Sequence, residues 1–189
     1  MNWQGKRVLV TGCSGVIGRH LLKYLLDQQA VVRGIDMNPC GLMSEKSFDF
    51  LQKDLLHLNP INVLSFEPEI IFHLAAAFER SEENVEFWQN NYMNNLLVSH
   101  QVIDMLRYSQ SVKKFIFASS YLVYDCALYS SSKKASDPVY LKETAQKNPR
   151  NLTGAAKYYA EKEIEFFHTN LSRDLQYINA RIYRSYGED

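Results

Sequence analysis

Three glycines stand at the spacing of a phosphate-binding turn. Gly12, Gly15 and Gly18 lie within residues 6–20, which read KRVLVTGCSGVIGRH. A β-branched run precedes them and a segment with helical spacing follows, so they occupy a turn between a strand and a helix. There Gly12 permits a tight turn, Gly15 admits a pyrophosphate close to the backbone, and Gly18 lets the helix pack on the strand. Because the helix start also presents unpaired N–H groups, the stretch predicts a dinucleotide site.

A carboxylate, Asp36, falls at the spacing expected of a ribose-binding group. It ends the apolar segment 30–36 (AVVRGID), 18 residues after Gly18 and 24 after Gly12. In a βαβ unit such a carboxylate accepts hydrogen bonds from both ribose hydroxyls and repels a 2′-phosphate. No Arg or Lys follows directly, so the sequence predicts NAD rather than NADP. A turn-forming Asp ahead of Asn38 is the other interpretation.

Length and composition favour one globular α/β domain over residues 1–189. Lys and Arg together number 21, as do Asp and Glu, so nothing favours a nucleic-acid partner or an acidic membrane surface. No apolar run approaches the roughly 20 residues of a membrane span, and the first residues contain no apolar signal core. Three scattered cysteines indicate neither a disulfide framework nor a metal site. We therefore expect a cytoplasmic protein.

Apolar segments alternate with segments of helical spacing, which is typical of a parallel sheet covered by helices. Strands are expected at 7–10, 30–36, 48–52, 69–77, 113–118 and 176–183, and helices at 17–26, 86–108 and 154–170. The run 69–77 (EIIFHLAAA) should lie at the centre of the sheet, with His73 as a hydrogen-bonded core histidine. Residues 125–152 read as a long surface loop. On the last helix, the residues expected to share a face are Ala155, Tyr159, Ile164, Phe167 and Leu171.

Taken in order, the motifs resemble the extended short-chain dehydrogenases, a family that includes NAD-dependent nucleotide-sugar epimerases and dehydratases. The matching stretches are TGCSGVIG (11–18), Asp36, KDL (53–55), IIFHLAA (70–76), NN (90–91), KFIFASSYLVY (114–124) and RIYRSYG (181–187). The resemblance implies a Rossmann-like doubly wound parallel sheet. It also implies NAD as cofactor, a nucleotide-linked sugar as substrate, and hydride transfer between the two.

The resemblance also implies roles for single residues. Asp54 and Leu55 would flank the adenine, Asn91 would support the active site from its helix, and Ser120 would bind the reacting sugar oxygen. In the family a Tyr-x-x-x-Lys pair completes the site: the lysine binds the nicotinamide ribose and lowers the tyrosine pKa, and the tyrosinate takes a proton. The implied cofactor-binding residues are Gly12, Gly15, Val16, Ile17, Gly18, Asp36, Asp54, Leu55, Leu74, Ala75, Ala76, Asn91 and Lys157.

The catalytic tyrosine is missing from the favoured alignment. Glu143 and Pro149 reproduce the family's approach to this position, which places Thr153 where the tyrosine should be. Lys157 is then the lysine, and Glu161 follows four residues later. One lysine cannot bring a threonine hydroxyl near neutral pKa, whereas tyrosine starts at about 10. Thr153 could instead cap free N–H groups at the start of its helix. We therefore expect Ser120, Thr153 and Lys157 in a site with an altered proton relay.

Other assignments stay open. Tyr158 and Lys162 satisfy Tyr-x-x-x-Lys literally and would give an ordinary enzyme. Tyr121 and Tyr124 are candidate substitute bases, although strand alternation should point Tyr121 away from Ser120. Arg184, where the family often has Asn, could pair with a phosphate or carboxylate or form a surface salt bridge.

Length is a second departure from the family pattern. Family members continue beyond 181–187 into a region that carries most of the sugar-nucleotide pocket, so the sheet is expected to be truncated before that region. The favoured function is an NAD-dependent epimerase/dehydratase-like protein, and the alternative is a catalytically degenerate NAD-binding scaffold or sensor. Family members often form homodimers through the helices that correspond to 86–108 and 154–170, where Phe166 and Phe167 could pack.

Overall fold

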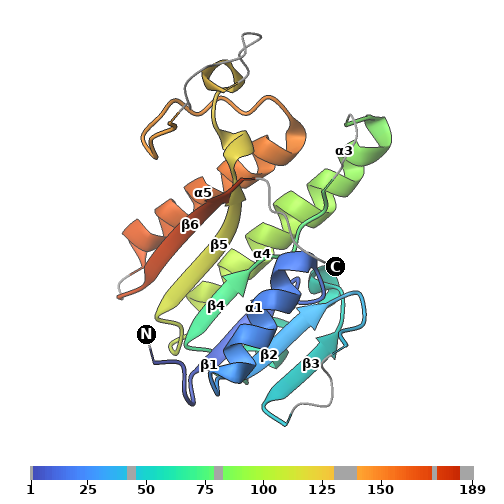
Figure 1. The fold of residues 1–189 in the computed structure, drawn as a ribbon, viewed down its shortest axis with the longest axis vertical. Helices are drawn as coiled ribbons and strands as arrows, with labels where there is room; N and C mark the ends of the chain where they lie inside the picture. Colours follow the sequence, from blue (N-terminus) through green and yellow to red (C-terminus); the bar gives the residue numbers. More distant parts are fainter. Residues whose placement is uncertain (1, 42–45, 79–82, 130–139, 172–173, 184–189) are drawn as a thin grey trace.

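The core of the protein is a six-stranded, fully parallel sheet (Figure 1). The computed structural model describes residues 2–41, 46–78, 83–129, 140–171 and 174–183. The strand order is β3-β2-β1-β4-β5-β6, so the sheet grows in opposite directions from β1 and β4. This confirms the Rossmann-like doubly wound sheet. The strands are β1 (Arg7–Thr11), β2 (Val31–Asp36), β3 (Phe48–Gln52), β4 (Ile70–His73), β5 (Lys114–Ser120) and β6 (Gln176–Ile182).

Helices cover both faces of this sheet. They are α1 (Val16–Asp27), α2 (Pro60–Leu64), α3 (Val85–Asn91), α4 (Val98–Asp104) and α5 (Leu152–Asn170). A π-helical segment, Tyr92–Leu97, joins α3 to α4, and 3₁₀ turns lie at Leu55–His57, Met105–Arg107, Tyr121–Val123 and Cys126–Leu128. The predicted helix at 86–108 is therefore one helical path with a π turn in its middle. The sequence reading missed α2, which Asn59 and Pro60 begin.

Side-chain alternation along β1 builds two apolar layers. Val8 and Val10 are buried with Leu22 and Leu25 of α1, whereas Leu9 belongs to the cluster on the other face, with α4 and α5. Figure 1 shows α1 on one side of the sheet and α4 and α5 on the other. Because successive side chains of a strand point to opposite faces, a strand covered on both faces reads as a continuous apolar run.

The predicted strand 69–77 is wrong at its carboxyl end. β4 stops at His73, and Leu74 N–H makes one more bond, to the Thr11 carbonyl (3.1 Å). The chain then leaves the sheet, because the Asn95 side chain accepts from Ala77 N–H (2.8 Å) and donates to the Ala77 carbonyl (2.9 Å). Leu74–Ala77 therefore form a loop at the carboxyl edge of the sheet.

His73 is the hydrogen-bonded core histidine that the sequence predicts. Its ring is fully buried, with Nδ1 2.7 Å from Thr11 Oγ1 and Nε2 3.2 Å from Ser99 Oγ. Burial lowers its pKa to about 3, with a smaller contribution from the charge of Lys157. The imidazole is therefore neutral at physiological pH, and it ties β4 to β1 and α4.

The predicted face of α5 is right in its second half, where Ile164 is buried and Phe167 and Leu171 pack against the core, and wrong in its first half. Ala155 and Tyr159 are exposed, and polar groups share the buried face with alanine and isoleucine. The buried side chains of this helix are those of Thr153, Ala156, Lys157, Ala160, Glu161 and Ile164. A hydrophobic periodicity cannot find such a face, because part of it is polar.

Among the helices of the described residues, none combines the length and the apolar character needed to cross a membrane.

Gly18→Ala should destabilise the fold, because a Cβ at this position would overlap the Gly12 carbonyl oxygen and lie 2.7 Å from Cys13 Cα. Both contacts are backbone, so relieving them means moving the turn, and we expect the free energy of unfolding to fall by roughly 1–3 kcal/mol. Urea titration measures it. Gly41→Ala is the matched control, since nothing lies within 4 Å of its added Cβ. Equal stability of the two variants would contradict the close packing of α1 on the turn.

Candidate functional site

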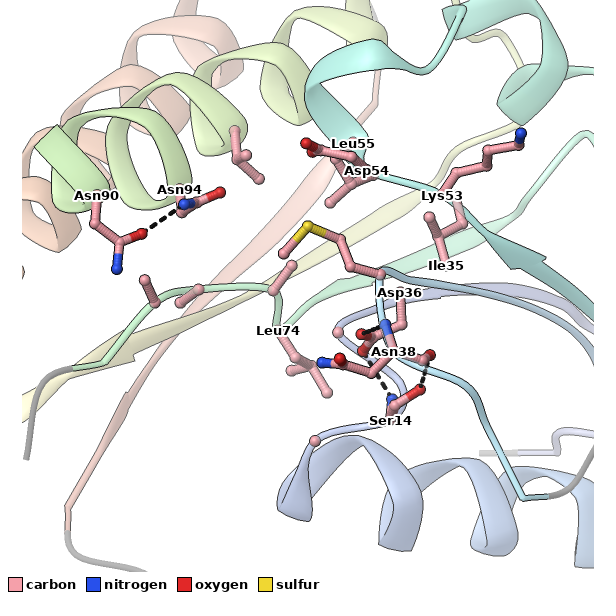
Figure 2. Close-up of a pocket in the computed structure, with 17 residues that line it drawn as sticks. Ser14, Ile35, Asp36, Asn38, Lys53, Asp54, Leu55, Leu74, Asn90 and Asn94 are labelled. Atoms are coloured by element: carbon pink, nitrogen blue, oxygen red, sulfur yellow. Dashed lines mark hydrogen bonds between the residues drawn. The ribbon is translucent and has the colours of Figure 1, made fainter.

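A cavity of about 410 Å³ opens at the carboxyl ends of β1, β2 and β4. This is where the strand order reverses, which is where open α/β sheets bind their ligands. The cavity is lined by Gly12, Ser14, Gly15, Ile35, Asp36, Met37, Asn38, Lys53, Asp54, Leu55, Leu74, Ala75, Ala76, Ala77, Asn90, Asn94 and Val98 (Figure 2).

Eight of the predicted cofactor residues are in this lining. They are Gly12, Gly15, Asp36, Asp54, Leu55, Leu74, Ala75 and Ala76. The remaining predicted residues, Val16, Ile17, Gly18, Asn91 and Lys157, and the predicted catalytic Ser120 and Thr153, are not. The other nine lining residues are not among the predicted cofactor residues, and three of them, Asn90, Asn94 and Val98, come from the helical path from α3 to α4.

Two glycines shape the wall between β1 and α1. Gly12 has φ +71°, and a Cβ there would lie 2.6 Å from Ala75 N, so the turn passes close to the loop after β4. Gly15 is different: an added Cβ would meet only the Gly12 carbonyl oxygen, at 3.4 Å. The protein itself therefore gives Gly15 room for a side chain, and the space beside it is open to a ligand.

The first turn of α1 begins directly behind Gly15. Within the part of the chain that the structure describes, the N–H groups of Val16, Ile17 and Gly18 have no hydrogen-bond acceptor. No acidic side chain lies in this turn, and the Val16 and Ile17 side chains are 39% exposed. Free N–H groups at the positive end of a helix dipole are suited to an anion.

Asp36 connects the glycine turn to the end of β2. Its carboxylate accepts from Ser14 N–H (2.9 Å) and from Asn38 N–H (2.9 Å), and Ser14 Oγ donates to the Asn38 carbonyl (2.9 Å; Figure 2). The Asn38 contact is the one expected of a turn-forming Asp, so this interpretation describes part of its role. Each carboxylate oxygen keeps a second lone pair for a ligand hydroxyl.

Lys53, Asp54 and Leu55 form the wall beyond β3. Asp54 begins the 3₁₀ turn Leu55–His57, where its Oδ1 accepts from Leu56 N–H at 2.9 Å. Leu55 is buried and presents an apolar surface to the cavity. This combination of a fixed carboxylate and an apolar side chain is compatible with a flat base.

Four asparagines of α3 and the following π turn have two different roles on the side of the cavity opposite Asp36. Asn91 is buried outside the lining, and its Oδ1 accepts from Asn95 Nδ2 (2.8 Å), which holds Ala77. It thus supports the wall indirectly. Asn90 and Asn94 do line the cavity, across from Asp36, and Asn94 Nδ2 donates to Asn90 Oδ1 at 2.6 Å (Figure 2). In the sequence, these residues are indicated by two Asn-Asn dipeptides that begin four residues apart.

Ser120 lies at the end of β5, beside the start of α5. Its Oγ accepts from Leu122 N–H at 3.2 Å, which begins the 3₁₀ turn Tyr121–Val123. Gly154 packs against this turn so closely that an added Cβ would lie 2.5 Å from the Leu122 carbonyl oxygen. The structure thus brings the predicted Ser120 and Thr153 to neighbouring elements.

Thr153 does not cap its helix in the way proposed above. Its hydroxyl donates to Glu83 Oε1 at 2.7 Å, whereas Asn151 is the N-cap, with its side-chain oxygen accepting from Gly154 N–H. Glu83 also accepts from Thr153 N–H (3.0 Å) and from Leu152 N–H (2.6 Å). The threonine side chain is buried, and the carboxylate of Glu83 comes from the segment just before α3.

Lys157 lies one turn further along the same buried face of α5. Its Nζ is 4.7 Å from the centre of the Phe117 ring, and burial lowers the pKa of the amine to about 8. Tyr158 and Lys162, the alternative pair, lie instead along a second cavity between α5 and β6. There the exposed Lys162 forms an ion pair with Glu165 (2.7 Å).

The tyrosines and arginines near the end of β5 are engaged with one another. Tyr121 stacks on Tyr183, with ring centroids 5.3 Å apart. Arg181 forms a two-pronged ion pair with the buried Glu161 (2.9 and 2.8 Å) and donates to the phenol oxygen of Tyr124 (3.0 Å). The sequence reading did not single out Arg181. Arg184, which it did, lies outside the described residues.

Comparison with known proteins gives one family. The family model of the NAD dependent epimerase/dehydratase family matches residues 8–189. An uncharacterized protein of Sinorhizobium fredii, y4nG, is 30% identical over 156 residues, which cover 82% of this chain and 36% of that protein. An uncharacterized UDP-glucose epimerase of Bacillus subtilis, YtcB, is 29% identical over 175 residues, which cover 83% of this chain and 52% of the relative.

Among solved structures, MoeE5 in complex with UDP-glucuronic acid and NAD superposes with a TM-score of 0.75 at 25% identity. The match covers 90% of this chain and 52% of MoeE5. The chain thus spans between about a third and a half of the length of these relatives. Since the family model matches nearly the whole chain, the protein belongs to the NAD-dependent epimerase/dehydratase family.

Proposed function

We propose that this chain is the NAD-binding domain, residues 1–189, of an enzyme that transfers hydride between NAD and a carbon of a nucleotide-linked sugar. The observation that carries the proposal is the wall at Gly15, where an open backbone and the free N–H groups of α1 lie across the cavity edge from Asp36. Family membership and the UDP-sugars named for YtcB and MoeE5 support the substrate class.

Each part of the cavity fits one part of the dinucleotide. Gly15 and the N–H groups of Val16 and Ile17 would bind the pyrophosphate. Asp36 would accept the adenosine ribose hydroxyls, with Asp54 and Leu55 at the adenine. The loop Leu74–Ala77, held by Asn95 and through it by Asn91, would form the floor. Bound NAD supplies a two-electron acceptor.

The catalytic groups would come from β5 and α5. Lys157 would orient the nicotinamide ribose, for which its buried amine offers donors that no described residue uses. Because Ser120 Oγ accepts a hydrogen bond from Leu122 N–H, its own proton is available to the sugar oxygen. Thr153 donates its hydroxyl proton to Glu83, which supports a relay that would differ from the tyrosine relay of the family.

We also propose that the chain forms a homodimer through the outer sides of α3 and α5. Large aromatic side chains are exposed there: Trp88 and Tyr92 at 62% and 52%, and Tyr159 and Phe166 at 50% and 63%. Phe167 packs against the core instead, so it is not part of this surface. A surface with this many exposed rings is typical of an association site.

Calorimetric titration of the chain with NAD and with NADP tests the cofactor assignment. We expect saturable NAD binding and at least about tenfold weaker NADP binding, because a 2′-phosphate would face the Asp36 carboxylate. Gly15→Ala should weaken NAD binding at least about tenfold, since its Cβ would stand in the path of the pyrophosphate.

The matched control for this titration is Gly41→Ala, which should bind NAD like the wild type. Neither substitution should change thermal stability, because the added Cβ at 15 has ordinary contact distances and the one at 41 has none. Undiminished NAD binding by Gly15→Ala would refute the assignment of the pyrophosphate to this wall.

Lys157→Met should stabilise the ligand-free chain at pH 7 by about 3 kcal/mol, because burying the charged amine lowers its pKa from 10.5 to about 8. Between these values the unfolded chain holds more protons than the folded one, so wild-type stability rises with pH through this window. The difference between variant and wild type should therefore shrink toward pH 10.5. Urea titrations at several pH values measure it, and a pH-independent difference would show that the buried charge is not its cause.

Sedimentation equilibrium tests the dimer. Phe166→Glu combined with Trp88→Glu should yield monomers, because each places a charge in an apolar contact. Tyr24→Glu, on the exposed side of α1, is the control and should sediment as the wild type does. A wild-type protein that is monomeric at every concentration would contradict the proposal.

A further inference from the structure

A carboxylate from a different element stands at the start of α5, beside Thr153. Glu83 lies two residues before α3, and its side chain reaches 69 and 70 positions along the chain to Leu152 and Thr153. Three hydrogen bonds hold it there, at 2.6, 3.0 and 2.7 Å. Three donors that converge on one carboxylate fix both its position and its orientation.

The two oxygens of Glu83 are not equally used. Oε1 accepts from both the N–H and the hydroxyl of Thr153, which occupies its two lone pairs. Among the described residues, Oε2 accepts only from Leu152 N–H, which leaves its second lone pair for a ligand hydroxyl. Glu83 as a whole is half-buried, so the residue combines a fixed carboxylate with partial exposure.

Two other polar groups near the end of β5, Glu161 and Tyr124, lack this combination. Glu161 is bound by Arg181 through two nitrogens and by Ser119 Oγ, which leaves it neutralised and buried. The Tyr124 phenol oxygen accepts from Arg181. Within the part of the chain that the structure describes, Glu83 forms no ion pair, and its three partners are neutral donors.

Ser120 lies close to the same point. Leu122 donates its N–H to Ser120 Oγ, and its carbonyl oxygen packs against Gly154. Gly154 directly follows Thr153 in the chain. The end of β5 and the Glu83 carboxylate therefore meet at the first turn of α5. A sugar hydroxyl bound by Ser120 would have the open lone pair of Glu83 as its neighbouring acceptor.

We propose that Glu83 is the proton acceptor of this site, anchored by Thr153 at the position where the family has a tyrosine. This inference rests on the proposed function, which supplies NAD as the oxidant. In the step, the sugar O–H bond breaks and its proton goes to Glu83 Oε2. The C–H bond on the same carbon breaks and its hydride passes to NAD, so that the alcohol becomes a carbonyl. Return of the hydride is accompanied by return of the proton from Glu83.

The test compares turnover with cofactor affinity. Conversion of UDP-glucose and of UDP-glucuronic acid by the full-length protein is followed as turnover, transient NADH absorbance reports the hydride transfer, and the NAD Kd is measured by calorimetry. Glu83→Gln should lower kcat by about 10²–10⁴-fold, with the KM of the nucleotide sugar and the NAD Kd changed less than about threefold. Glu86→Gln, a carboxylate exposed in the first turn of α3, is the matched control and should change neither.

Two further variants separate chemistry from helix capping. Glu83→Ala also loses the hydrogen bonds from Leu152 and Thr153 at the start of α5. Formate added to this variant should restore turnover in proportion to the formate concentration. Thr153→Val keeps the carboxylate but removes one donor, so kcat should fall only about tenfold. If the role were structural, Glu83→Gln would weaken NAD binding and lower the melting temperature along with kcat.

The outcomes are distinct. Wild-type turnover that survives Glu83→Gln overturns the proposal. A full-length protein that binds NAD but converts neither probe also overturns it and favours an NAD-binding scaffold. Absence of NAD binding refutes the proposed function itself, together with everything that rests on it.

Discussion

The close contact between Gly12 and the loop after β4 determines the geometry of the cavity. Gly12 lies so near Ala75 that a side chain there would strike its backbone, and Gly18 packs as tightly on the Gly12–Cys13 backbone. These two contacts place the first N–H groups of α1 at the edge of the sheet, next to Leu74–Ala77. The Asp36 carboxylate then joins the same turn to β2 through Ser14 N–H. One cavity wall is therefore built at the ends of three strands, and its close packing requires that two positions lack a Cβ.

Polar groups on the buried face of α5 form a second cluster, outside the lining of the cavity. The negative charge of Glu161 is compensated by a bidentate ion pair with Arg181, which connects α5 to β6. Lys157 has no such partner among the described residues, and burial without a counterion shifts its pKa downward. A buried, unpaired amine lowers the stability of the fold, and such a group is typical of a functional site rather than of a packing role. Thr153, at the end of the same face, is satisfied by Glu83.

The opposite wall depends on an irregular helix. The π turn at Tyr92–Leu97 lets Asn91 and Asn95 face inward, where they hold Ala77, while Asn90 and Asn94 face the cavity. Such turns often occur at functional sites, because one extra residue per turn redirects the side chains that follow. The loop Leu74–Ala77 is thereby fixed from both sides, by the glycine turn and by the asparagines.

The sequence by itself determined the sheet, the glycine turn and the site of the cavity. These depend on local patterns: β-branched runs, the spacing of three glycines, and Asp36 at the end of the second strand. It also indicated His73 as a core residue, because a single polar group inside an apolar strand must find partners there.

Tertiary structure alone decided the rest, because those features depend on partners far apart in the chain. The end of β4 is set by Asn95, the buried face of α5 by Arg181 and Phe117, and the role of Thr153 by Glu83, 70 residues away. None of these pairs has a period or a spacing that a linear pattern contains. Hydrogen-bond partners are chosen by distance in space, and only the packing of the helices on the sheet brings these groups within reach of each other.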